Sequence, residues 1–245
     1  MSVCAERRAG SPVNILAIGA HPDDIVLQCG GTLAKYAAAG HAITMVIMCP
    51  GVAKRDPPSL EETIRGRQRE VSASAATIGA TAVWMGYGDF DIPYDYESKL
   101  PLVEQIRKTR PEVIFGHHPS DYSSDHRRAS ELLDECYMMA FQSGIKTESP
   151  AMHPRAMIYH MDTVGGLGFV PDAYVDITDY FHIKRRMIEC HESEVRPYAG
   201  NPVVDTVEWI EVNARYRGIQ AGVRYAEAFC WPRRWASMET KHLLP

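Results

Sequence analysis

Short apolar runs alternate with longer segments of helical pattern through the first half of the chain, and this alternation restricts the fold more than any other feature. The apolar runs are too short to form helices, and the second is rich in β-branched residues, as is typical of buried strands. The expected strands cover residues 13–20, 43–49, 82–85 and 113–116. The expected helices between them cover residues 27–39, 60–78 and 97–109.

This order of strands and helices predicts a parallel sheet, because parallel neighbours must be joined by a crossover, which is nearly always right-handed. The usual strand order in such a Rossmann-like half is 3-2-1-4, so the first and fourth strands lie side by side. Ligands bind to such sheets beyond the carboxyl ends of the strands, where the strand order reverses. The loops after the first and fourth strands are therefore the expected position of a functional site.

The second half of the chain is less regular. Helices are expected at residues 125–141, 177–190 and 204–219, and strands at residues 157–160, 173–176 and 225–229. The chain has 245 residues, of which 45% are hydrophobic, so it can bury a sizeable core. We therefore expect a single α/β domain over residues 1–245, with a Rossmann-like parallel sheet flanked by helices and a loose leader at residues 1–12.

Charge, hydropathy and cysteine content argue against several classes of protein. The net charge of −5 is unlike that of nucleic-acid-binding proteins, which usually carry a basic excess. No segment approaches the roughly 20 apolar residues that cross a membrane. The six cysteines are scattered without a C-x-x-C pair, which is typical of free thiols in a reducing compartment. We expect a cytoplasmic protein, and the small-molecule substrate expected for it follows from the motifs described below.

Histidine and aspartate residues gather in the two loops that the sheet order brings together. His21-Pro22-Asp23-Asp24 directly follows the first strand, and a segment at residues 117–126, with the sequence HHPSDYSSDH, follows the fourth. A histidine and a carboxylate three positions apart on a tight turn can converge on one metal ion, and Pro22 stiffens that turn. Two polar loops far apart in the sequence are thus expected to face one crevice.

Imidazole and carboxylate ligands without thiolate suit zinc, although other divalent metals also accept them. Three protein ligands leave one coordination position for water, which is the pattern of catalytic sites. Zinc lowers the pKa of that water, and a carboxylate beside it can accept the proton. One aspartate of the pair would bind the metal, and the other would act as the general base. In the alternative interpretation, Asp23 or Asp24 only caps the helix that begins near Leu27.

His21-Pro22-Asp23-Asp24, together with Ser124-Asp125-His126 after the fourth strand, resembles the LmbE/PIG-L family of zinc-dependent de-N-acetylases. Weaker matches extend the resemblance over most of the chain. They are Gly30-Gly31-Thr32-Leu33, Arg67 with Glu70, Gly79, Asp89, Lys184, His191-Glu192-Ser193 and the closing segment at residues 222–229. The resemblance implies an LmbE-like three-layer sandwich and, because the family often forms homo-oligomers, a protein that can do the same.

The functional residues of the family transfer to this sequence position by position. The resemblance implies His21, Asp24 and His126 as zinc ligands, and Asp23 as the general base that activates the metal-bound water. It also implies Asp125 as a partner that orients a metal-binding histidine or tunes the charge of the site.

One position departs from the family pattern. Ser123 stands where the family usually has a histidine, three residues before His126. In the deacetylases that histidine helps to stabilise the oxyanion or to protonate the leaving amine. We expect His191 to supply the missing imidazole, because it matches a family position. Further candidates are His117, His118, Tyr122 and Glu194.

Two reactions are compatible with this pattern. The first is hydrolysis of an N-acetyl group on an amino sugar or its conjugate. The second is hydration of an unsaturated dicarboxylate or tricarboxylate, because the 4-oxalomesaconate hydratases of aromatic catabolism are similar zinc proteins that also lack that histidine. A binding module with a structural zinc ion is a third and lesser alternative, because an open coordination position indicates catalysis.

Substrate contacts are expected from Arg55, Arg67 and Tyr122. Arginine is suited to this role because its guanidinium group can donate two parallel hydrogen bonds to a carboxylate. Arg196 and Arg217 are further candidates for binding a carboxylate substrate.

Overall fold

The computed structural model describes residues 11–52, 60–153, 156–201 and 205–232. One seven-stranded sheet runs through this part of the chain, in the order β3-β2-β1-β4-β5-β7-β6. The strands are β1 (Asn14–Gly19), β2 (Ala42–Ile47), β3 (Thr81–Trp84), β4 (Val113–Gly116), β5 (Met157–Met161), β6 (Ala173–Asp176) and β7 (Ala226–Cys230). Residues 1–10 of the expected leader lie outside the described residues, and so does Arg55.

The order and direction of the first four strands confirm the Rossmann-like prediction. β1 pairs in parallel with β2 on one side and with β4 on the other, and β2 pairs in parallel with β3. β5 continues the parallel part beside β4. β7 then inserts between β5 and β6 and runs antiparallel to both, which the sequence pattern did not predict.

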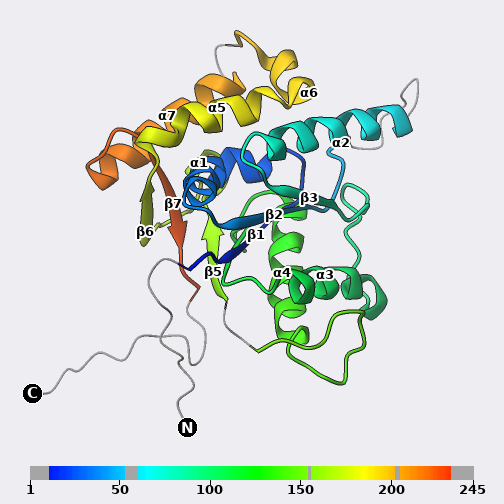
Figure 1. Cartoon of the computed structure of the whole chain (residues 1–245). Helices are drawn as coiled ribbons and strands as arrows, with labels where there is room; N and C mark the ends of the chain where they lie inside the picture. The colour runs from blue at the N-terminus through cyan, green and yellow to red at the C-terminus, as the bar shows by residue number, and fades with distance from the viewer. Residues whose placement is uncertain (1–10, 53–59, 154–155, 202–204, 233–245) are drawn as a thin grey trace, which may run out of the picture.

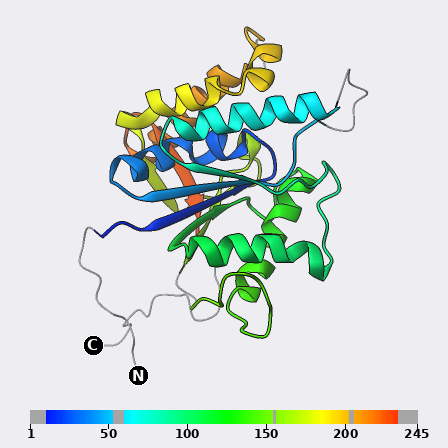
Figure 2. The same cartoon turned by 45° about the vertical axis from the view of Figure 1, so that its right-hand side comes forward.

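Helices cover both faces of the sheet, so the molecule has three layers (Figure 1). One face carries α1 (Asp24–Ala38), α2 (Leu60–Ala76), α5 (Phe181–Glu189) and α7 (Thr206–Ala221), and the other carries α3 (Tyr96–Thr109) and α4 (Ser124–Met139). Figure 2 shows α2 and α3 on opposite sides of the strands. The short helix α6 (Glu192–Val195) follows α5. The predicted three-layer α/β sandwich is thus confirmed.

The apolar run of β1 is continuous because both faces of this strand are buried. Ile15 and Ala17 belong to the core beneath α1 and α5, whereas Leu16 and Ile18 belong to the core beneath α3 and α4. Side chains alternate between the two faces of a strand, so a central strand with helices on both sides requires apolar residues at every position.

Most predicted element boundaries lie within a few residues of the observed ones. The helix expected at residues 177–190 is instead a 3-10 turn, Thr178–Tyr180, followed by α5. No helix among the described residues is long and apolar enough to cross a lipid bilayer. That the protein is cytoplasmic, forms homo-oligomers and consists of one domain stays a prediction of the sequence.

Glycines at the ends of two neighbouring strands bring the site loops close to the sheet. A Cβ atom on Gly19, at the end of β1, would lie 2.9 Å from the side chain of Ile25 in α1. A Cβ atom on Gly116, at the end of β4, would lie 2.5 Å from the side chain of Leu133 in α4. Glycine therefore lets both helices pack tightly against the strands that precede them. Because β1 and β4 are parallel neighbours, both helices begin at the same edge of the sheet.

Candidate metal centre

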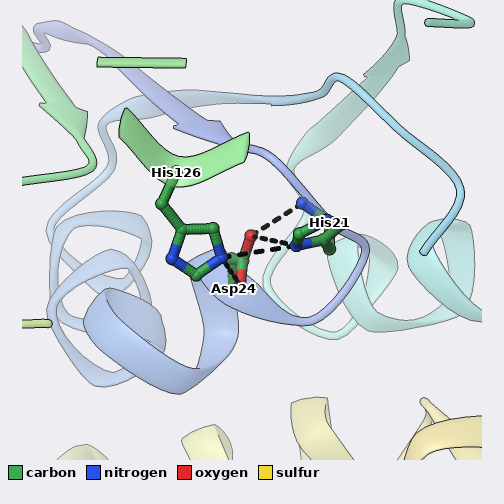
Figure 3. Close-up of side chains that lie close together, drawn as sticks. All are labelled: His21, Asp24 and His126. Carbon is green, nitrogen blue, oxygen red and sulfur yellow. Dashed lines mark hydrogen bonds and ion pairs between the residues drawn. The ribbon is translucent and has the colours of Figure 1, made fainter. Parts of the chain in front are cut away.

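Three side chains from two loops converge at the carboxyl edge of the sheet (Figure 3). His21 and Asp24 come from the turn that leads from β1 into α1, and His126 comes from the first turn of α4. His126 Nε2 lies 3.3 Å from His21 Nδ1 and 3.3 Å from Asp24 Oδ1. Asp24 Oδ2 lies 3.4 Å from His21 Nδ1. The structure thus brings together the ligand set expected from the sequence.

These separations have the size that one metal ion requires. Two atoms bonded at about 2.0–2.1 Å to a tetrahedral zinc ion lie about 3.3–3.4 Å from each other. The facing nitrogens of the two histidines lie 3.3 Å apart, and the two oxygens of Asp24 lie 3.3 Å from His126 Nε2 and 3.4 Å from His21 Nδ1, so each contact has the length of one edge of such a tetrahedron. The donor set, two imidazoles and one carboxylate, is also of the kind that zinc accepts. The residues present therefore fit a zinc ion.

A second carboxylate stands behind each histidine. The Nε2 atom of His21 lies 3.1 Å from Asp125 Oδ2, and the Nδ1 atom of His126 lies 3.2 Å from Asp121 Oδ1. The other nitrogen of each ring, His21 Nδ1 and His126 Nε2, faces the cluster. Such a carboxylate fixes the tautomer and orientation of a metal-binding imidazole and makes it a stronger ligand. Asp125 was expected in this role, whereas Asp121 was not recognised from the sequence.

The paired aspartates do not act as helix caps. Asp23 is the N-cap residue of α1, but its side chain makes no capping hydrogen bond. Asp24 is the first helical residue, and its Oδ2 atom accepts a hydrogen bond from the backbone N–H of His21 at 2.7 Å. This contact closes the tight turn and aims the Asp24 carboxylate at the histidine cluster. The structure gives no support to the alternative in which these residues only cap the helix.

Ser123 has a structural task that the sequence comparison did not reveal. It is the N-cap residue of α4, and its side chain accepts a hydrogen bond from the backbone N–H of His126. Asp121 Oδ1 in turn accepts a hydrogen bond from the backbone N–H of Ser123 at 2.9 Å. Ser123 thus holds the start of the helix that carries His126.

His117 joins the two loops to each other. Its Nε2 atom accepts a hydrogen bond from the backbone N–H of Ala20 at 2.9 Å, and its ring stacks on His126 with centroids 4.0 Å apart. Because that nitrogen is already engaged, the alternative ligand group of His117, Asp121 and His126 fits a metal less well than the first group. His118 instead packs edge-on against Phe169. His117 and His118 thus both have structural contacts.

The electrostatics of the cluster favour a cation. Burial lowers the pKa of His21, but hydrogen bonds to Asp125 and Asp24 outweigh burial and raise that pKa to about 11. Burial likewise lowers the pKa of His126, but Asp24 and Asp121 raise it to about 10. Burial raises the pKa of Asp24, yet the charges of His126 and His117 hold it well below its usual range. The carboxylates therefore create a negative potential that a metal ion would neutralise.

Asp23 lies beside this cluster within the field of a buried arginine. Burial and the charge of Asp24 raise the pKa of Asp23 to about 6, while Arg67 opposes the shift. Arg67 lies in α2, is buried, and forms an ion pair with Glu194 of α6. This ion pair links α6 to the region of the site, because Glu194 approaches Gly51 in the loop after β2, next to His21. The sequence had suggested Glu194 only as a further candidate for the role of the missing histidine.

His191 is fully buried just before α6. Neither of its ring nitrogens has a hydrogen-bond partner among the described residues. Burial and the nearby charge of Arg67 lower its pKa to about 4, so the ring is neutral at pH 7. The structure shows no direct contact of this ring with the metal-binding cluster in the described part of the chain.

Three further residues that the sequence suggested as substrate contacts lie in different parts of the structure. Tyr122 is 67% exposed on the loop before α4, and its backbone carbonyl accepts a hydrogen bond from Arg127. Arg217 is buried and forms an ion pair with Asp162. Arg196 pairs on the surface with Glu192. Of these residues, only Tyr122 belongs to a loop of the site.

Comparison with known proteins matches the segment that builds this site. The family model described as PIG-L, GlcNAc-PI de-N-acetylase, matches residues 16–137, which include both loops. A 1D-myo-inositol 2-acetamido-2-deoxy-alpha-D-glucopyranoside deacetylase of Actinosynnema mirum is 36% identical over 236 residues, which cover 76% of this chain and 82% of that protein.

Two further relatives differ in their reactions. The 4-oxalmesaconate hydratase of Pseudomonas putida is 28% identical over 206 residues, which cover 78% of this chain and 80% of that protein. The solved structure of the N,N′-diacetylchitobiose deacetylase from Pyrococcus horikoshii matches with a TM-score of 0.76 and 27% identity, covering 88% of this chain and 82% of the other. Shared fold, shared loops and these sequence matches lead to one conclusion: the chain belongs to the PIG-L (LmbE-like) family.

Proposed function

We propose that this protein is a zinc-dependent hydrolase that removes an N-acetyl group from an amino sugar or its conjugate. The proposal depends on one observation above all, the convergence of the side chains of His21, Asp24 and His126 within 3.3–3.4 Å of one another. Two of the relatives described above are deacetylases of amino-sugar compounds. The substrate would be a small molecule.

His21, Asp24 and His126 would hold the zinc ion, and Asp125 and Asp121 would orient the two imidazoles. Bound zinc would supply Lewis-acid activation of a water molecule and of the amide carbonyl. The protein contributes a fixed set of ligands whose negative charge suits a divalent cation.

Asp23 is the proposed general base. Its carboxylate caps no helix N–H and stands next to the ligand Asp24 in the sequence. It would take a proton from the attacking water and then pass that proton to the amide nitrogen as the C–N bond breaks. Acetate and a free amine would leave, and the carboxylate of Asp23 would be regenerated.

His191 is the proposed donor to the oxygen of the attacked carbonyl. A neutral imidazole carries one N–H, and this buried ring has no other partner among the described residues. A hydrogen bond to the negative oxygen that develops during attack would satisfy this N–H and stabilise the transition state. Because the pKa of His191 is lowered to about 4, hydrogen bonding suits it better than proton transfer.

Arg67 and Tyr122 stay the proposed substrate contacts. A substrate group that reaches Arg67 would compete with Glu194 for the guanidinium. Tyr122 lies on the exposed part of the loop that carries His126 and could contact the outer part of a substrate. Arg55, the third residue expected in this role, lies outside the described residues.

Acetate release tests the proposal directly. Zinc-loaded protein is incubated with N-acetylglucosamine and with N,N′-diacetylchitobiose, and acetate and new primary amine are measured together. The expected result is equal amounts of both products, with no release by the His126→Ala variant. Protein that binds zinc but releases no acetate from any N-acetylated amino sugar would refute the proposal.

Hydration of an unsaturated carboxylate is the second candidate, favoured by the match to 4-oxalmesaconate hydratase and by Ser123. In that reaction Asp23 would again activate water, which would add across a carbon–carbon double bond. Zinc-dependent loss of conjugated-diene absorbance without acetate release would establish this second function.

A further inference from the structure

A buried arginine beside the metal centre already has a carboxylate of the protein on its guanidinium group. Arg67 of α2 is 8% exposed and forms an ion pair with Glu194 of α6. Burial lowers the pKa of this arginine, whereas the charges of Glu70, Asp23 and Asp89 oppose that shift. The structure thus gathers several carboxylates around one guanidinium group, and Glu194 is the one that pairs with it.

This ion pair adjoins the turn that carries two of the metal ligands. A Cβ atom placed on Gly51 would lie 3.9 Å from Glu194 Oε1. The same atom would lie 3.3 Å from Pro22 Cδ and 3.7 Å from His21 Cβ. The carboxylate of Glu194 is therefore next to the segment that leads from β1 into α1, in which Asp23 is the proposed base. A substrate held at the metal ligands would lie near this ion pair.

The segment that carries Glu194 is attached to the helix that carries Arg67. The backbone N–H of Ser193 donates to Glu70 Oε1 at 2.9 Å, and the hydroxyl of Ser193 donates to the other oxygen of the same carboxylate. Glu70 lies three residues after Arg67 in α2, so both side chains lie on one face of that helix. Two neighbouring contacts therefore hold Glu194 on Arg67 more firmly than an isolated surface ion pair would be held.

The occupant of the guanidinium group affects which substrates the site can accept. An arginine without a partner would donate two parallel hydrogen bonds to a substrate carboxylate. With Glu194 in that place, an incoming carboxylate would have to displace Glu194 or stay without a cation among other carboxylates, and either costs free energy. An uncharged substrate meets no such penalty, because its hydroxyl groups can donate to Glu194 and its oxygens can accept from Arg67 Nε. That nitrogen has no hydrogen-bond partner among the described residues.

We propose that Glu194 is a specificity-determining residue, which occupies Arg67 and thereby excludes anionic substrates from the metal centre. The inference rests on the proposed function and narrows its substrates to N-acetylated sugars without an acidic group near the reacting amide. Glu194 acts through Arg67 and takes no part in the bond-breaking step. Removing this one charge, without altering any metal ligand, should therefore open the site to acids.

Three variants separate this role from a general effect of charge. Glu194→Gln removes the charge and keeps the size of the side chain. Glu192→Gln is the matched control, because Glu192 lies in the same short helix but pairs on the surface with Arg196. The double variant Glu194→Gln/Arg67→Gln shows whether a gain in affinity depends on Arg67. All are made in a zinc-loaded Asp23→Asn background, so that no ligand is consumed, and elemental analysis checks their zinc content.

Affinities are measured by calorimetry for probes that share one sugar ring. N-acetylglucosamine is uncharged, N-acetylmuramic acid adds a carboxylate through O3, and N-acetylglucosamine 6-phosphate adds a phosphate at O6. The parent should bind both acids roughly tenfold more weakly than the neutral sugar, because like charges repel. Glu194→Gln should raise the affinity for at least one acid, relative to the neutral sugar, about tenfold, the order of one charge-assisted hydrogen bond. Glu192→Gln should keep the parent's ratios within about twofold, and the double variant should lose the gain.

A parent protein that binds either acid as well as the neutral sugar would overturn the inference, whether or not the variants fold. Unchanged ratios in Glu194→Gln, or a gain that persists in the double variant, would also overturn it. No binding of the neutral sugar would count against both this inference and the proposed function.

The separate acetate assay distinguishes the two failures. If Glu194→Gln gains affinity for an acid but the wild-type protein releases no acetate, the role of Glu194 stands and the proposed reaction is wrong. If acetate is released but the ratios do not respond, the reaction stands and Glu194 does not select the substrate.

Discussion

Asp121 Oδ1 lies 3.2 Å from the Nδ1 atom of His126, on the edge of the ring that faces away from the metal-binding cluster. Asp125 occupies the equivalent position behind His21, at 3.1 Å from Nε2. Each imidazole thus has a carboxylate at one ring nitrogen, while its other ring nitrogen faces the cluster. This arrangement makes the site more than a chance gathering of polar side chains, because it fixes which nitrogen of each ring faces the cluster.

Asp121→Asn should weaken zinc binding about 10- to 100-fold, the range typical for loss of a carboxylate behind a metal-bound histidine. The reason is that an amide holds the His126 ring less firmly and does not increase its basicity. Zinc affinity is measured by competition with a chromophoric chelator. The control is Asp91→Asn, since Asp91 is an exposed carboxylate that forms no ion pair with either histidine in the described part of the chain. Equal affinity of Asp121→Asn and wild type would show that the carboxylate does not support the metal.

Asp23→Asn should lower kcat about 10²- to 10⁴-fold, the usual contribution of a general base, while one zinc ion stays bound. Asparagine has nearly the same shape but cannot accept a proton from water. Rates are measured by acetate release and zinc by elemental analysis of the same sample. Near wild-type turnover would mean that another group accepts the proton, and loss of zinc would place Asp23 among the ligands.

His191 should make the fold sensitive to acid. Burial and Arg67 lower its pKa to about 4 in the folded protein, below the ordinary value of 6.5. As pH falls from the ordinary value towards the lowered one, the unfolded chain binds a proton that the folded chain refuses. The free energy of unfolding should therefore decrease over this interval, by about 3 kcal/mol in total from this residue.

Urea unfolding of wild type and His191→Leu at pH 7 and near pH 4.5 checks this expectation. The variant should lose less stability between the two pH values than wild type does. His153→Gln, at an exposed histidine, serves as the control for general effects of removing an imidazole. The same loss in His191→Leu and wild type would contradict the lowered pKa.

Lys184→Met should destabilise the fold by about 3–5 kcal/mol, because it leaves a buried carboxylate without its cation. Lys184 Nζ lies 2.6 Å from Glu227 Oε1, and Glu227 also accepts hydrogen bonds from the backbone N–H groups of Gly31 and Thr32 in α1. The double variant Lys184→Met/Glu227→Gln should recover part of the loss. Denaturant unfolding measures both, and a double variant no more stable than Lys184→Met would argue that the charge is not the cause.

The meeting of the two loops rich in histidine and aspartate could be predicted from the sequence because it depends on topology and local spacing, whereas the choice of His126 within the second loop came from the family resemblance. Strand order places the loops after β1 and β4 side by side, and the turn from His21 to Asp24 needs only a short polar segment after a buried strand. Such relations follow from the alternation of strands and helices. They do not require knowledge of individual side-chain rotamers.

The contacts that the sequence missed depend on the detailed path of the chain. Asp121 lies close to His126 because the loop turns just before α4. Its Oδ1 atom accepts a hydrogen bond from the backbone N–H of Ser123, the N-cap residue of that helix. The left-handed conformation of Phe90 is unexpected, because local preference alone would place glycine there. The position of β7 between β5 and β6 was also missed, because the residues of a strand show that it is buried but not which strands it pairs with.

The hydrogen bond from Ala20 to His117 ties the two site loops together through the protein alone. A bound cation would thus not be the only link between the two loops of its binding site, unlike the zinc ion of a zinc finger, whose removal unfolds the domain. Chelation should consequently leave a preformed, vacant set of ligands that accepts a different divalent ion without refolding. Which metal the enzyme carries would then reflect the supply in its surroundings as much as the protein's own selectivity.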